Sequence, residues 1–118
     1  MKILLIEDSK IQRIVNGRAL IKAGYSVINA GDGEEGLRSA AQNLPDLILL
    51  DMMLPRLSGL DVLRTLKKDA LVRHIAVIVL SGLGQANETK LLTEGAAAFL
   101  VKSLENNSAI APVKPGPL

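Results

Sequence analysis

The sequence contains no cysteine, and aromatic residues make up only 2% of its 118 positions. Without cysteine, the chain has no disulfide bonds, thiolate metal sites or thiol nucleophiles. The scarcity of aromatic residues means that the core must be aliphatic, and the 48% hydrophobic content is ample for it. A chain of this length is expected to form one domain around a single core.

Long apolar runs and strong charge are also missing. A membrane-spanning helix needs about 20 predominantly apolar residues, and no apolar run in this sequence comes near that length. The first apolar run is too short for a secretory signal, and Glu7 and Asp8 follow it at once. The formal net charge is only +2, and the longest basic run is Lys67-Lys68, which is typical of a solvated surface. We therefore expect a cytoplasmic protein that binds neither membranes nor nucleic acid directly.

What the sequence does contain is four short apolar runs that each lead directly into a polar residue. Continuous apolar runs of this length are typical of strands that are buried on both faces of a parallel sheet. The carboxyl ends of such strands meet at one edge, where the ligands of open α/β sheets bind. The runs cover residues 2–6, 47–50, 76–80 and 97–101, and the polar residues that follow them are Glu7 with Asp8, Asp51, Ser81 and Lys102.

Amphipathic stretches between the runs predict helices. The first covers residues 9–23, and its apolar stripe is assigned to Ile11, Ile14, Val15 and Leu20.

Two further helices begin at N-cap signals. Asp32 with Glu35, and Ser58 with Asp61, have the spacing of capping boxes. A weaker helical pattern covers residues 85–94. Together with a short strand at residues 25–28, these elements predict an α/β sandwich with helices on both faces of the sheet.

The C-terminal end departs from this alternation. Residues 103–108 offer a turn at best, and prolines interrupt residues 111–118, so a fifth helix is expected to be short or missing. We predict a single domain over residues 1–104, followed by an irregular Pro-rich tail or linker over residues 105–118.

The residues at the predicted strand ends suit phosphoryl chemistry on a divalent metal. Asp51 can act as a nucleophile toward phosphorus and become an acyl phosphate. Glu7 and Asp8 would bring two more negative charges, which is costly unless a cation neutralises them. Because all three side chains offer hard oxygen donors, Mg²⁺ is favoured, with Mn²⁺ as a second candidate. Lys102 and Ser81 would contact phosphoryl oxygens.

Six short segments carry a resemblance to a known family. They are Ile6-Glu7-Asp8-Ser9, Asp32-Gly33, Leu50-Asp51-Met52-Met53-Leu54-Pro55, Ser58-Gly59, Ser81 and Phe99-Leu100-Val101-Lys102. Through them the chain resembles the receiver domains of two-component response regulators and is similar to single-domain chemotaxis regulators. The resemblance implies a flavodoxin-like, doubly wound sheet of five parallel strands in the order 2-1-3-4-5.

The resemblance also implies roles for the strand-end residues. Asp51 would take a phosphoryl group from a phosphohistidine on a sensor histidine kinase or a phosphotransfer protein. The side chains of Asp8 and Asp51 and the backbone carbonyl of Met53 would ligate Mg²⁺, and Glu7 would act through a metal-bound water.

A switch is implied as well. Ser81 and Lys102 would hold phosphoryl oxygens, and movement of Ser81 would vacate space that Phe99 then fills. Such a domain assists its own phosphorylation and slow dephosphorylation but is not an enzyme toward other substrates. Its expected partners are the phosphodonor, a downstream protein target and, in a homodimer, a second copy.

Other interpretations stay open. A haloacid dehalogenase-type phosphatase needs a second acid two residues after the nucleophile, where this chain has Met53. A flavin or nucleotide carrier needs a Gly/Ser/Thr-rich loop after the first strand, where Glu7 and Asp8 would repel phosphate. Ser103 stands where the resembled family usually has a proline. The altered C-terminal end therefore leaves a phosphorylation-independent, receiver-like interaction module as the main alternative.

Overall fold

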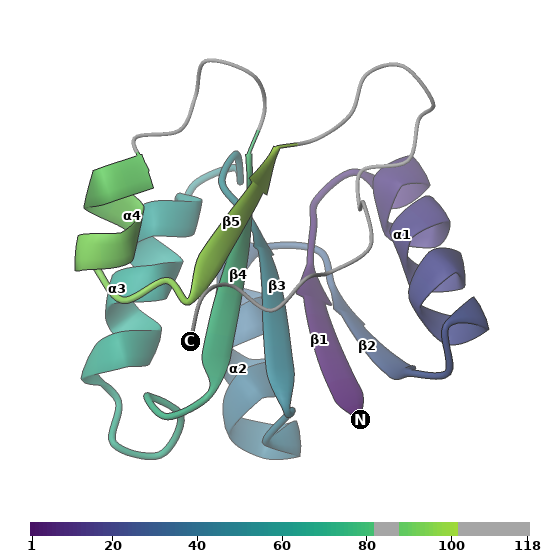
Figure 1. Ribbon diagram of the computed structural model, residues 1–118, viewed down its shortest axis with the longest axis horizontal. Helices are drawn as coiled ribbons and strands as arrows, with labels where there is room; N and C mark the ends of the chain where they lie inside the picture. Colours follow the sequence, from purple (N-terminus) through teal and green to yellow (C-terminus); the bar gives the residue numbers. More distant parts are fainter. Residues whose placement is uncertain (82–87, 102–118) are drawn as a thin grey trace.

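Five parallel strands form one sheet in the order β2-β1-β3-β4-β5 (Figure 1). The structure, a computed structural model, describes residues 1–81 and 88–101. The order confirms the predicted doubly wound sheet, whereas the fifth-helix prediction and the tail over residues 105–118 lie outside the described residues. The strands are β1 (Lys2–Ile6), β2 (Ser26–Ala30), β3 (Leu47–Asp51), β4 (Ala76–Ser81) and β5 (Ala98–Val101), and the helices are α1 (Lys10–Lys22), α2 (Gly33–Asn43), α3 (Gly59–Lys68) and α4 (Glu88–Thr93).

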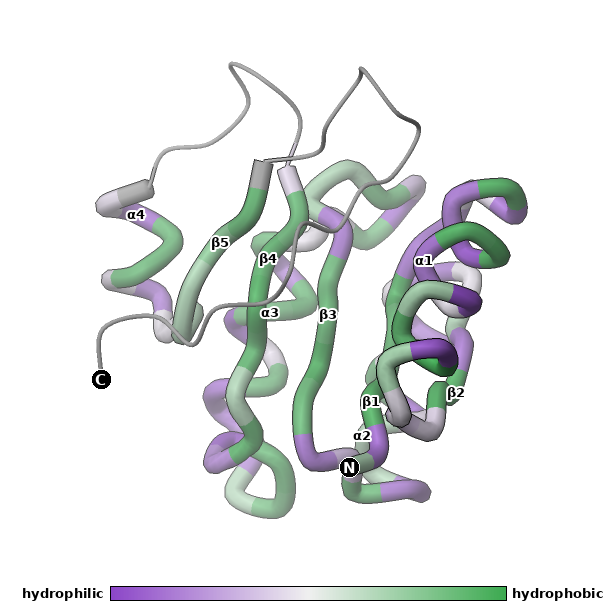
Figure 2. Tube along the Cα trace, turned by 45° about the vertical axis from the view of Figure 1, so that its right-hand side comes forward, coloured by the Kyte–Doolittle hydropathy of each residue, from purple (hydrophilic) through white to green (hydrophobic). Residues whose placement is uncertain are grey.

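The inner strands are apolar on both faces because each face packs against a separate core cluster. Neighbouring residues of β1 illustrate this alternation: Leu4 and Ile6 join one cluster, and Ile3 and Leu5 join the other. The first cluster contains side chains from α2, α3 and α4, and the second contains Leu20 from α1. The hydropathy colouring of β3 and β4 is correspondingly hydrophobic along most of their length, and it turns hydrophilic at the upper end of β3 (Figure 2).

The buried face of α1 agrees with the predicted stripe only in part: Leu20 is buried as predicted and Val15 is partly buried. Ile11 and Ile14 are 72% and 44% exposed, so their assignment to the core was wrong. The buried residues are Asn16, Gly17 and Leu20. This face packs against β1 and β2, where a Cβ on Gly17 would lie 4.0 Å from the nearest atom of Asn29. Hydropathy therefore identified Leu20 correctly, but it missed Asn16 and Gly17, which share its face.

Both predicted N-caps are confirmed. The Asp32 carboxylate accepts a hydrogen bond from the Glu35 backbone N–H at 2.8 Å, and the Ser58 hydroxyl accepts one from the Asp61 N–H at 3.2 Å. Glu35 in turn accepts from the Gly31 N–H at 3.0 Å. These caps fix the points at which α2 and α3 leave the carboxyl edge of the sheet.

Ionic and polar contacts join α3 to the segment around α4. Arg64 in α3 donates to Glu94 at 2.9 Å, and this hydrogen bond lowers the pKa of Glu94. Lys67 donates to the backbone carbonyls of Arg73 and Ile75, while burial lowers the pKa of its ammonium group. These contacts join α3 to Glu94, which follows α4, and to the connection that leads from α3 into β4. None of the helices in the described part of the chain is long and apolar enough to cross a membrane.

Candidate functional site

The strand register brings the predicted site residues to one edge of the sheet. Ile6, the last residue of β1, pairs with Leu50, so Glu7 and Asp8 follow β1 beside the end of β3. Asp51 itself pairs with Leu80, and Ser81 follows directly in β4. The sequence-based inference that these strand ends converge is therefore confirmed for β1, β3 and β4.

Three carboxylates meet at this edge. One oxygen from each of Glu7, Asp8 and Asp51 lies within 4.8 Å of the other two. Glu7 and Asp51 are buried, whereas Asp8 is exposed. Three carboxylates in one place offer the hard oxygen donors that divalent cations such as Mg²⁺ prefer.

The geometry of the cluster fits a small divalent cation. Mg²⁺ takes oxygen ligands at about 2.0–2.1 Å, so two ligands of one ion lie at most about 4 Å apart, or somewhat farther when one acts through water. Oxygen atoms that lie within 4.8 Å of one another fall slightly outside the limit for two direct ligands and inside the limit for a site at which one acid acts through water. The three residues can therefore hold one Mg²⁺ or Mn²⁺ ion.

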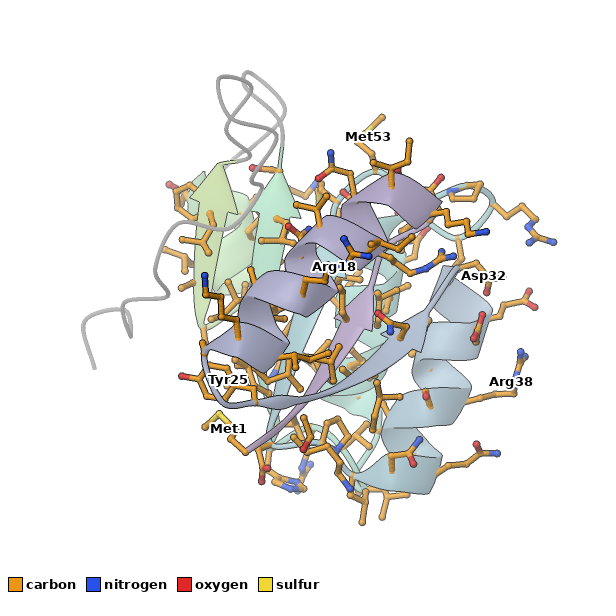
Figure 3. All side chains as sticks on the ribbon, turned by 90° about the vertical axis from the view of Figure 1, so that its right-hand side faces the viewer. Met1, Arg18, Tyr25, Asp32, Arg38 and Met53 are labelled. Atoms are coloured by element: carbon orange, nitrogen blue, oxygen red, sulfur yellow. The ribbon has the colours of Figure 1, made fainter. Side chains whose placement is uncertain are left out.

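Asp51 is held by the backbone around it. Its Oδ1 accepts a hydrogen bond from the Met53 N–H at 3.1 Å, and the Met52 N–H donates to the carbonyl of Leu80 at 2.8 Å. The Met53 side chain is 59% exposed and lies at the upper edge of the molecule (Figure 3). The residue whose backbone contacts the Asp51 carboxylate on this side therefore carries an apolar, exposed side chain.

Ser81 is fully buried, and its hydroxyl has no hydrogen-bond partner among the residues that the structure describes. Phe99, which pairs with Val79 across the β4–β5 ladder, is partly buried and packs against the cluster shared with α2, α3 and α4. Val101 pairs with Ser81 at the end of β5, but Lys102, the next residue, lies outside the described part of the chain. Its predicted role stays a prediction.

One side chain near the acids was not singled out by the sequence analysis. Arg13 extends back from α1, and its Nη1 donates to the backbone carbonyls of Glu7 at 2.8 Å and of Asp8 at 3.3 Å. A cation near the beginning of a helix opposes the helix dipole, but Lys10, the first residue of α1, has the same property, so charge alone did not distinguish Arg13.

A family model described as the response regulator receiver domain matches residues 3–114. The chain belongs to this family. Receiver domains are signalling modules of two-component systems, and this membership agrees with an aspartate at the end of β3 beside an acidic pair at the end of β1. The predicted family and fold are both confirmed.

The chain is also similar to individual members of the family. It is 43% identical to the gliding motility regulatory protein of Myxococcus xanthus over 86% of this chain, but it spans only 13% of that protein. It is 31% identical to the polar-differentiation response regulator DivK of Brucella anthropi, with 95% of this chain and 92% of that protein covered. A response regulator receiver domain protein from Clostridium thermocellum has a TM-score of 0.77 at 38% identity, covering 87% of this chain and 82% of the other.

Proposed function

We propose that this receiver domain accepts a phosphoryl group on Asp51 in a reaction that depends on a divalent cation, and that the modification changes its contacts with other proteins. The observation that carries the proposal is the meeting of the Asp51 carboxylate with those of Glu7 and Asp8 within 4.8 Å. The phosphodonor is a phosphohistidine on a sensor histidine kinase or a phosphotransfer protein.

In the proposed reaction Asp51 is the nucleophile. One carboxylate oxygen bonds to phosphorus while the N–P bond of the phosphohistidine breaks, which yields an acyl phosphate and releases the donor imidazole. Asp8, Asp51 and the Met53 carbonyl would hold Mg²⁺ directly, and Glu7 would hold it through water. When bound, the ion neutralises negative charge on the carboxylates and on the phosphoryl oxygens. Mn²⁺ has the same preference for oxygen ligands and can replace it.

The remaining strand-end residues recognise the product. The Ser81 hydroxyl, buried without a partner in the described part of the chain, can donate to a phosphoryl oxygen. Lys102 would provide a fixed positive charge to another oxygen. Movement of Ser81 toward the phosphoryl group would allow Phe99 to pack farther inward, which couples the modification to the surface around β5. A downstream protein, or a second copy of the chain, would recognise that surface.

The test is the intact mass of the protein after incubation with acetyl phosphate. With Mg²⁺ we expect the mass of one phosphoryl group to be added, and with EDTA we expect no addition. Addition that is equal in EDTA would refute the metal dependence. A folded protein that gains no mass from acetyl phosphate or from a phosphorylated histidine kinase would instead be a phosphorylation-independent interaction module.

Ser81→Ala is expected to stabilise the unphosphorylated protein and to slow its phosphorylation. The substitution removes a buried hydroxyl without a partner in the described chain, so the free energy of unfolding of the unphosphorylated protein should rise by about 1 kcal/mol. It should also slow phosphorylation about tenfold or more, since a hydrogen bond to a charged group contributes roughly 1.5–3 kcal/mol. Urea denaturation and time-resolved intact mass measure the two effects. Ser26→Ala, at an exposed position of β2, is the control that should change neither quantity.

A Ser81→Ala protein that is phosphorylated at the wild-type rate would contradict the proposed contact with the phosphoryl group. A loss of stability would contradict the description of the hydroxyl as unsatisfied.

A further inference from the structure

The guanidinium group of Arg13 binds the backbone of the acidic pair rather than the side chains. Arg13 is the fourth residue of α1 after its N-cap, Ser9, and its Nη1 donates to the carbonyls of Glu7 and Asp8 at 2.8 and 3.3 Å. One side chain therefore contacts both residues that precede α1 and contribute carboxylates to the cluster.

The position of this charge is unfavourable for the helix alone. Anions stabilise the beginning of a helix and cations its end, yet the first turn of α1 contains no acidic residue, begins with Lys10 and is followed directly by Arg13. What distinguishes Arg13 from Lys10 is therefore its pair of hydrogen bonds and not its position. A residue that breaks a local rule without a local gain is expected to serve another purpose. Here the gain is the pair of hydrogen bonds to the connection between β1 and α1.

The neighbouring connection leaves room for the guanidinium group. At Gly31, which follows β2, an added Cβ would lie 3.0 Å from Nη1 of Arg13. A Cβ at this position would require the nitrogen that binds the two carbonyls to shift by a few tenths of an ångström. The absence of a side chain at Gly31 therefore leaves space for the guanidinium group of Arg13 beside the acidic pair.

We propose that Arg13 is a positioning residue for the cation site: by fixing the carbonyls of Glu7 and Asp8, it holds both carboxylates in reach of Asp51. The inference rests on the proposed function, which requires a divalent cation at these acids. Groups that orient metal ligands without touching the metal commonly change its affinity 10- to 100-fold when they are removed.

The direction of the effect distinguishes positioning from simple electrostatics. Removal of a positive charge near three carboxylates would, by Coulomb's law alone, make the site more negative and strengthen Mg²⁺ binding. Loss of positioning would weaken Mg²⁺ binding, because the carboxylates of Glu7 and Asp8 would then sample orientations that do not point toward a shared ion. Weaker binding in a variant without the Arg13 charge therefore cannot arise from the change in charge.

The experiment is isothermal titration calorimetry of the full chain with MgCl₂. We expect the Kd for Mg²⁺ to rise about tenfold in Arg13→Met and to rise less in Arg13→Lys, which keeps a donor but loses the planar fork. Arg18→Met is the matched control, because Arg18 is an exposed residue of the same helix and its loss changes the net charge equally (Figure 3). It should leave the Kd unchanged. Gly31→Ala keeps every charge and should also weaken binding.

The possible outcomes separate the two proposals. If the wild type binds Mg²⁺ and Arg13→Met binds it equally or more tightly, the positioning role is refuted and the proposed function stands. If the wild type does not bind Mg²⁺, the proposed function fails and the inference fails with it. Circular dichroism reports whether each variant is folded. If Arg13→Met does not fold, a Kd above the wild-type value in Arg13→Lys and Gly31→Ala supports the positioning role, and a wild-type Kd in both refutes it.

Discussion

Asp51→Asn is expected to abolish phosphoryl acceptance, the largest effect of any single substitution in this chain. The amide that replaces the carboxylate is a far weaker nucleophile toward phosphorus, and it removes one of three acidic groups from the cation site. The protein should stay folded, because the amide oxygen can still accept the hydrogen bond that Asp51 receives from the Met53 N–H. Intact mass after incubation with acetyl phosphate and Mg²⁺ should therefore equal that of the untreated variant.

A second aspartate near the other end of β3 supplies a matched control. Asp46 is exposed and accepts a hydrogen bond from the Lys2 N–H at 2.7 Å, far along the strand from the acidic cluster. Asp46→Asn should be phosphorylated like the wild type. Phosphoryl addition to Asp51→Asn would show that another residue is the acceptor, and Asp8 would be the first to test by peptide mapping.

The acidic cluster could be predicted from the sequence because its position depends mainly on topology. Strands that are buried on both faces appear in the sequence as continuous apolar runs, and parallel strands end at the same edge. Once β1 and β3 were recognised as neighbours, Glu7, Asp8 and Asp51 had to lie close together. The apolar runs and the residues that follow them were therefore enough to predict which carboxylates lie together.

The complete buried face of α1 and the contacts of Arg13 could not be predicted from the sequence, for different physical reasons. The buried face of α1 was assigned correctly at Leu20 but wrongly at Ile11 and Ile14. The other buried residues of the helix are the polar residue Asn16 and the small residue Gly17. Hydropathy ranks residues by their cost of exposure and does not detect where a helix must approach a strand closely. Arg13 was missed because its contacts are to backbone carbonyls, which carry no sequence signature, and because Lys10 has the same charge near the start of the same helix.

Gly59→Ala should be strongly destabilising even though alanine is the better helix former. Gly59 is the first residue of α3, and its N–H donates to the Met52 carbonyl at 3.1 Å. A Cβ at this position would lie 2.5 Å from the carbonyl oxygen of Asp51 and 2.7 Å from the Cα of Met52. Because both are backbone atoms, no side-chain rotation can relieve the contact. We expect the free energy of unfolding to fall by about 1–3 kcal/mol, the usual cost of overpacking.

Gly17→Ala is the opposite case and the control. Gly17 lies in the interior of α1, and an added Cβ would meet only Asn29 Oδ1 at 4.0 Å, which is an ordinary contact. Alanine there should raise the free energy of unfolding by about 0.5–1 kcal/mol through its helix propensity. Urea denaturation followed by circular dichroism compares the two variants directly, and stabilisation by Gly59→Ala would contradict the close approach of α3 to β3.

Gly59→Ala is also expected to slow phosphoryl acceptance, because the atoms that must move belong to the backbone of Asp51 and Met52. The contact falls on the backbone of Asp51 and Met52, so relief of the overlap displaces the acceptor relative to Glu7 and Asp8, whose positions depend on β1. We therefore expect the folded fraction of Gly59→Ala to accept phosphoryl groups more slowly than the wild type, whereas Gly17→Ala keeps the wild-type rate. An unchanged rate in both variants would mean that the strain is absorbed by α3 alone and that the β3–α3 junction does not set the position of Asp51.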